Sequence, residues 1–176
     1  TGEMGNGGFK GDANFDGNSY NLWFESILIG RSIVGINAGD ANRLVAVLQE
    51  KEGAREIKGL AKGEMSSVLL HAANFNPAIS SIALLDPMSS YRGIVESFKY
   101  NTSEINYTVA GALKHYDLPD LLENLSITNP LVLHENTELK KELSLLPERG
   151  GKEKIKALSV KKSNDKKAYL TKWLNP

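Results

Sequence analysis

The stretch from Arg55 to Asp86 constrains the fold more than any other part of the chain. A short apolar segment leads into a turn flanked by Gly59 and Gly63. The apolar residues after that turn have the i, i+3, i+4, i+7 spacing of one helix face: Met65, Val68, Leu69 and Ala72. Asn76-Pro77 ends this helix, and residues 79–85 form an apolar strand without a charged side chain. A strand, a helix and a second buried strand of this length predict a parallel crossover unit.

Length and composition limit the classes of protein that the chain can belong to. Its 176 residues can form one domain with a sizeable core, and 41% apolar with 24% charged residues is typical of a globular protein. The net charge is zero, so we expect no nucleic-acid partner. No apolar run approaches the roughly 20 residues of a membrane span. Without cysteine the chain has no disulfide or thiolate metal site, and no motif indicates a cofactor.

Residues 1–19 are rich in glycine, which predicts a loop outside the folded domain. Asp12, Asn14 and Asp16 within it match the first half of a calcium-binding loop, D-x-N-x-D-G. The acid required at the last position of that motif is replaced by Trp23. The three residues are therefore candidate calcium ligands, or else members of a turn-rich loop whose side chains bond their own backbone.

The rest of the chain, residues 20–176, alternates between helical and strand patterns. We expect helices over 21–29 and 40–50, with the first of these buried, and an extended segment over 101–108. Two further strands are predicted at 131–134 and 155–160, and the helices expected after them span 137–146 and 165–174. The prediction is therefore an α/β domain with about four strands, a mostly parallel sheet and helices on both faces.

Several motifs resemble the distal, C-terminal half of an α/β-hydrolase, of the acetyl-xylan-esterase-like type found in Bacteroidetes. They are Gly30-Arg31-Ser32-Ile33-Val34-Gly35, Asp40 with Arg43-Leu44, the strand, turn and helix at 59–73, Leu84-Leu85-Asp86-Pro87 with Ser89-Ser90-Tyr91, and residues 112–121. The resemblance implies a longer protein, periplasmic or secreted, whose other strands are not in this chain. The strand at Arg55 would then be an edge, covered by the Gly-rich segment, by an upstream half or by a second chain, which includes a homo-oligomer.

The resemblance also assigns positions for a hydrolase triad. The nucleophile position in Gly59-Leu60-Ala61-Lys62-Gly63 is Ala61, and the acid position offers Glu135 and Glu138. The histidine should follow residues 155–160, but no histidine follows His134. The resemblance therefore implies a non-catalytic, pseudo-esterase domain with a structural or carbohydrate-related binding role. The alternative is an active carbohydrate esterase whose site is completed by an upstream segment or a second chain.

Polar residues near the carboxyl ends of the predicted strands could line a cleft, because parallel sheets form their clefts at that edge. The candidates are Glu64, Asp86, Ser89, His115 and Asp117. The alternative interpretation is that Asp86 and Asp117 cap helices and that His115 is a loop residue. Ser67 and His71 share a helical face, but a serine inside a helix usually bonds the preceding turn.

Overall fold

A four-stranded parallel sheet organises the described part of the chain. In the computed structural model, the described residues are 14–15, 18–97, 100–127, 130–135, 137–145, 156–159 and 163–175. The strands lie in the order β3 (Ile57–Lys62), β4 (Ile79–Leu85), β5 (Leu131–His134) and β6 (Lys156–Ser159). All neighbouring pairs are parallel, so the α/β class and the parallel sheet predicted from the sequence are confirmed.

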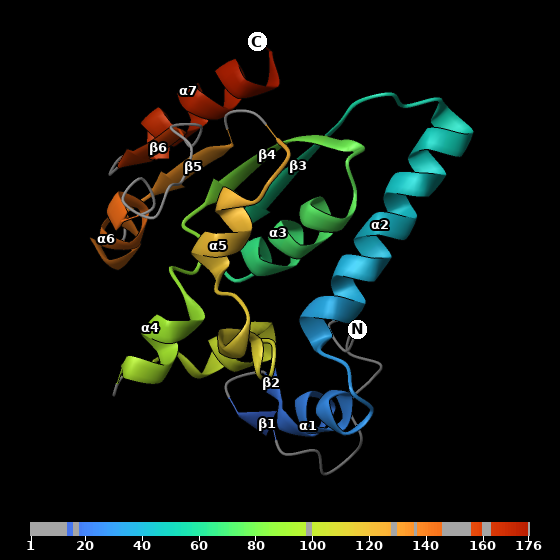
Figure 1. Cartoon of the computed structure of the whole chain (residues 1–176). Coiled ribbons are helices and arrows are strands. Elements are labelled where there is room, and N and C mark those ends of the chain that lie inside the picture. The colour runs from blue at the N-terminus through green and yellow to red at the C-terminus, as the bar shows by residue number, and fades with distance from the viewer. Residues whose placement is uncertain are drawn as a thin grey trace.

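Helices cover both faces of this sheet (Figure 1). One face carries Ile82, Leu84 and Val132 into the main core, where they meet side chains from five helices: α2 (Ile33–Glu52), α3 (Met65–Phe75), α4 (Tyr91–Glu96), α5 (Leu118–Glu123) and α6 (Thr137–Leu145). The alternate residues of β4 and β5 point to the opposite face, since successive side chains of a strand alternate. There Leu133 and its neighbours pack against Leu170 and Trp173 of α7 (Ser163–Leu174).

The N-terminal elements differ from the sequence prediction. Part of the expected loop pairs as an antiparallel hairpin of β1 (Asn14–Phe15) and β2 (Asn18–Ser19). The following helix, α1 (Tyr20–Leu28), was expected to be buried, but Phe24, Leu28 and Ile29 are exposed. This prediction is wrong because an apolar sequence does not itself supply a packing partner.

The break after the first helix lies where it was expected, but the second helix begins earlier than predicted. The break falls at Gly30, whose φ is 69°, and Ser32 caps α2 by accepting a hydrogen bond from Gly35 N. Gly35 and Gly39 lie inside α2, which therefore begins at Ile33 and not at residue 40 as predicted. A glycine inside a helix costs only about 1 kcal/mol, which the packing of α2 against α3 offsets.

Four short elements connect β4 to β5. They are α4 (Tyr91–Glu96), the 3-10 turns η1 (Thr102–Tyr107) and η2 (Ala112–Lys114), and α5. Figure 1 shows the first three below the sheet, in the same half of the molecule as α1. The extended structure expected over 101–108 is wrong, since the Asn101 side chain accepts from Ser103 N and begins η1. These connections provide most of the walls of the cavities described below.

Among the described residues, no helix combines the length and the apolar character needed to cross a bilayer.

Candidate functional site

The turn between β3 and α3 carries no hydroxyl or thiol side chain. Its residue with a left-handed backbone is Gly63, at φ 58°, and Gly63 N still donates to Leu85 O at 2.8 Å. Ala61 lies two residues earlier, buried in the strand and paired with Leu84. The turn therefore lies two residues later than predicted from the sequence, because the pairing of β3 with β4 extends to Lys62. Neither alanine nor glycine can attack a carbonyl.

An ion-pair cluster joins the carboxyl ends of β4 and β5 to α7. Lys166 Nζ lies 2.7 Å from Asp86 Oδ2 and 2.9 Å from Glu135 Oε1, and the Lys166 side chain is only 17% exposed. Hydrogen bonds to Asp86 and then Glu135 raise the pKa of Lys166. The side chain is therefore an ammonium at neutral pH and cannot accept a proton. We name Asp86, Glu135 and Lys166 the lysine cluster.

Asp86 also has an unusual backbone conformation. Its φ of 45° is positive, and no other non-glycine residue in the described part of the chain has a positive φ. Asp is one of the residue types that tolerate this left-handed backbone. Its backbone N donates to Leu133 O at 2.7 Å, and its Oδ1 is buried without a hydrogen-bond partner. The alternative that Asp86 caps a helix is wrong, because α4 is capped by Ser90, whose side chain accepts from Gly93 N.

A polar cavity of about 520 Å³ lies beyond the carboxyl end of β4, beside α4. Its wall contains Ser89, one of the predicted cleft residues, together with hydroxyl, amide and carboxyl groups that the sequence analysis did not select. The full lining is Met88, Ser89, Ser90, Gly93, Ile94, Glu96, Ser97, Tyr100, Asn101 and Glu104. We call this space the polar cavity.

Glu64 does not line the polar cavity, but η1 brings it close to Glu104, which does. Ser103 Oγ donates to Glu64 Oε1 at 3.2 Å, which brings the start of α3 next to Glu104. Burial raises the pKa of Glu104, a backbone hydrogen bond from Asn101 opposes this, and the negative charge of Glu64 raises the pKa further. The two glutamates therefore give this end of the cavity an acidic character.

Asp117 and His115 are not part of the polar cavity. Asp117 is buried at the N-cap of α5, where its Oδ1 accepts from Tyr91 N at 2.6 Å and from Leu118 N at 2.7 Å. Its Oδ2 accepts from Arg92 N at 3.2 Å, so one carboxylate joins the starts of α4 and α5. His115 is exposed after η2. For these two residues the structure agrees with the structural interpretation and not with a shared cleft.

Ser67 and His71 do not form a nucleophile and base. Ser67 Oγ donates to Glu64 O at 2.9 Å, while His71 Nδ1 lies 2.6 Å from the backbone oxygen of Ser67. A carbonyl oxygen can only accept, so Nδ1 carries the proton and Nε2 accepts from the Tyr116 hydroxyl at 2.9 Å. Burial lowers the pKa of His71, which keeps this imidazole neutral. Both ring nitrogens are therefore occupied inside the core.

The metal prediction finds no support in the described residues, where no three His, Cys, Asp or Glu side chains could hold a metal ion. Asp12 and Asp16 lie outside the described residues, and Asn14 begins β1. Comparisons with protein-family models, curated proteins and solved structures found no match to the chain. The likeness to α/β-hydrolases thus rests on the sequence motifs.

Lys166 and Glu104 were not predicted from the sequence. A signal for Lys166 existed, because a lysine in the first turn of a helix that follows a strand lies near the carboxyl edge of a parallel sheet. No such signal existed for Glu104, since its surroundings depend on a hydrogen bond between Ser103 and Glu64, 39 residues apart.

Proposed function

We propose that the chain is a non-catalytic, α/β-hydrolase-like domain of the pseudo-esterase type, and that its polar cavity binds a hydroxyl-rich ligand of the carbohydrate class. The observation that carries the first part is the lysine cluster. In the arrangement that the resemblance implies, the acid after β5 would orient a histidine near the start of the last helix. Here the acid Glu135 contacts the ammonium of Lys166 instead.

Acyl transfer through a covalent intermediate requires a nucleophile and a general base within hydrogen-bond reach of it. Gly63 at the turn has no side chain, and the raised pKa of Lys166 excludes it as a base at neutral pH. The chain has three histidines. His71 is held by Ser67 and Tyr116, His115 is exposed after η2, and His134 is buried in β5.

The composition of the polar cavity supports a carbohydrate ligand. Its volume of about 520 Å³ lies within the usual range for small-molecule sites. Serine hydroxyls and the Asn101 amide can both donate to and accept from sugar hydroxyls. The Glu104 carboxyl can donate only when it is protonated, and it can accept in either state. Tyr100 adds a half-exposed ring with an apolar face and a polar tip.

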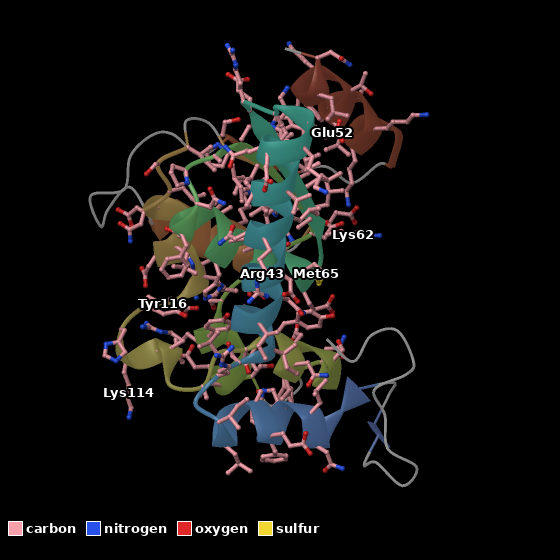
Figure 2. All side chains as sticks on the ribbon, turned by 90° about the vertical axis from the view of Figure 1, so that its right-hand side faces the viewer. Arg43, Glu52, Lys62, Met65, Lys114 and Tyr116 are labelled. Atoms are coloured by element: carbon pink, nitrogen blue, oxygen red, sulfur yellow. The ribbon has the colours of Figure 1, made fainter. Side chains whose placement is uncertain are left out.

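A pair of measurements tests this proposal. With 4-nitrophenyl acetate as the substrate, we expect no turnover above that of buffer, and turnover that is lost in Ser67→Ala would overturn the non-catalytic part. With acetylated and deacetylated xylo-oligosaccharides in calorimetric titration, we expect binding that is weakened at least fivefold by Glu104→Gln or Ser89→Ala. The matched control is Glu52→Gln, at the far end of α2 from the cavity (Figure 2). Oligosaccharide binding that is absent, or equally weakened by the control, would overturn the binding part.

The alternative function is an active carbohydrate esterase completed by another polypeptide segment or a second chain. One observation favours it: Leu60 is 54% exposed on β3, an edge strand of the described sheet. An edge strand with an exposed apolar residue can accept a further strand. If a second copy completes the site, the specific activity on 4-nitrophenyl acetate rises with protein concentration, and Leu60→Lys abolishes it. A specific activity that is zero at every concentration would reject completion by a second copy.

A further inference from the structure

A second cavity also borders α4, shares Ile94, Ser97 and Tyr100 with the polar cavity, and differs from it in composition. It has a volume of about 720 Å³ and is bounded by Trp23 and Phe24 of α1, Val95 of α4, and Tyr100, Leu113 and Lys114. We call it the apolar groove. It is within the size range of small-molecule sites, and it is built from segments that are far apart in the sequence.

The apolar groove gathers large side chains that are unusually exposed for their type. Val95 is 75% exposed and Phe24 is 55% exposed, and Tyr100 and Leu113 are also exposed. Single exposed apolar residues are ordinary, but several in one concave patch indicate a binding surface. The Trp23 and Phe24 rings stand edge to face, with centroids 4.9 Å apart and an interplanar angle of 72°. This geometry makes one wall of the groove a fixed aromatic surface.

The charge of the groove selects among ligands. Among the described residues that line it, Lys114 is the only one charged at neutral pH, and none carries a carboxylate. Figure 2 shows the Lys114 side chain extending from η2 at the outer margin of the molecule, while Tyr116 lies further in. An ammonium at the rim of an apolar groove is complementary to a ligand with an apolar body and an anionic end.

We propose that the apolar groove binds a medium-chain alkyl carboxylate, with its chain against Trp23, Phe24 and Val95 and its carboxylate facing Lys114. This inference does not depend on the function of the polar cavity. The ligand is identified by the apolar wall, which takes the alkyl chain, and by the single positive charge, which takes the head group.

The test uses decanoate titrated into the full chain by calorimetry. We expect saturable binding, and an affinity that falls about fourfold for each CH₂ removed from the ligand, which corresponds to about 0.8 kcal/mol for each group. Decyltrimethylammonium has the same chain with the opposite charge and should bind more weakly. Lys114→Gln should weaken decanoate about two- to fivefold, as expected for an exposed ion pair, and should leave decanol unaffected.

Val95→Asp should weaken decanoate more than tenfold, because the bound alkyl chain would remove the new carboxylate from water and the carboxylate would repel the head group of the ligand. The native Val95 side chain is largely exposed, so the fold should tolerate this change, and Leu113→Asp serves as a second groove variant. The matched control is Leu44→Asp, which replaces a similarly exposed residue of α2 outside the groove. Ser89→Ala in the polar cavity should have no effect. The proposal would be overturned if decanoate did not bind, or if decyltrimethylammonium bound as tightly as decanoate. It would also be overturned if Leu44→Asp weakened decanoate as much as Val95→Asp does.

Discussion

The two faces of the sheet are built differently, although the same strands supply both. On one face, Ile82, Leu84 and Val132 join a continuous core with the five helices α2 to α6. On the other face, Ala83, Leu131 and Leu133 form a small separate cluster that α7 covers through Leu170 and Trp173. Among the described residues, the first face is therefore supported by several independent elements, and the second is covered by one helix.

The difference has a consequence for the carboxyl edge of the sheet. The helix that covers the second face also brings Lys166 to Asp86 and Glu135. Trp173 Nε1 donates to Ser81 Oγ at 2.9 Å, which attaches the other end of the same helix to β4. The packing of α7 and the charge arrangement at the candidate site should consequently be lost together.

The largest predicted effect compares one leucine from each face. Leu84→Ala should lower the free energy of unfolding by about 3–5 kcal/mol, because the fixed helices around it cannot close the resulting cavity. Leu133→Ala should cost about 2–3 kcal/mol, because α7 alone can shift to fill part of the space. Urea unfolding of both variants, with the slope unchanged, measures the difference. An equal cost would mean that the two faces are equally rigid.

The second-largest loss of stability is expected at Asp117, the buried N-cap of α5. Asp117→Ala should cost about 1–3 kcal/mol, because the carboxylate accepts from backbone N–H groups of both α4 and α5. Asp117→Asn keeps one oxygen that can accept from Tyr91 and Leu118, so it should cost less than alanine. Thermal unfolding of the three proteins ranks them, and an alanine variant as stable as wild type would contradict the double-cap interpretation.

The strands could be predicted because their signal is local. The apolar runs at 79–85 and 131–134 coincide with β4 and β5, and Asp117 followed by Pro119 marks the start of α5. The exposure of α1 could not be predicted in this way, because burial depends on which surfaces a tertiary fold brings to the helix. The 3-10 turn η1 was missed for a related reason, since a polar sequence gives no apolar period to detect.

The candidate site was predicted only in part. Ser89 does line the polar cavity, whereas Glu64 does not line it and instead accepts a hydrogen bond from Ser103 of η1. Asp86 lies at the carboxyl end of β4 as expected, but its partner Lys166 is 80 residues further along the chain. A spacing rule that follows one helix or strand cannot detect such a pair, and the same limit applies to the groove between α1 and α4.

The third prediction concerns the attachment of α7. Lys166→Met should lower the free energy of unfolding by about 1 kcal/mol. The loss is small because Glu135 is half exposed, so that water screens its attraction to Lys166. Hydrogen exchange of the α7 amides should accelerate in this variant, while that of α3 stays unchanged. Lys167→Met, at the exposed neighbouring position, is the matched control and should behave as wild type.

The same ion pair predicts a dependence on pH. The folded pKa of Lys166 is raised, so its contribution to stability is fully present below the unfolded value of about 10.4 and is lost as the pH rises through the folded pKa. The stability difference between wild type and Lys166→Met should hence be constant from about pH 7 to 9 and shrink above about pH 10.5. A difference that persists at higher pH would assign the effect to packing of the lysine stem instead of its charge.

The smallest effect is expected at Leu60, on the side of β3 that points away from the main core. Leu60→Thr should change the free energy of unfolding by no more than about 0.5 kcal/mol, because Leu60 is already half exposed and threonine suits a strand. The free energy of unfolding, measured at two protein concentrations a hundredfold apart, shows whether a second copy of the chain covers the β3 edge. A loss above about 1.5 kcal/mol that grows with protein concentration would mean that a second copy covers Leu60, because association contributes to apparent stability by mass action. That outcome would give the weaker face of the sheet a second support besides α7 and would favour the completed-esterase alternative over the non-catalytic domain.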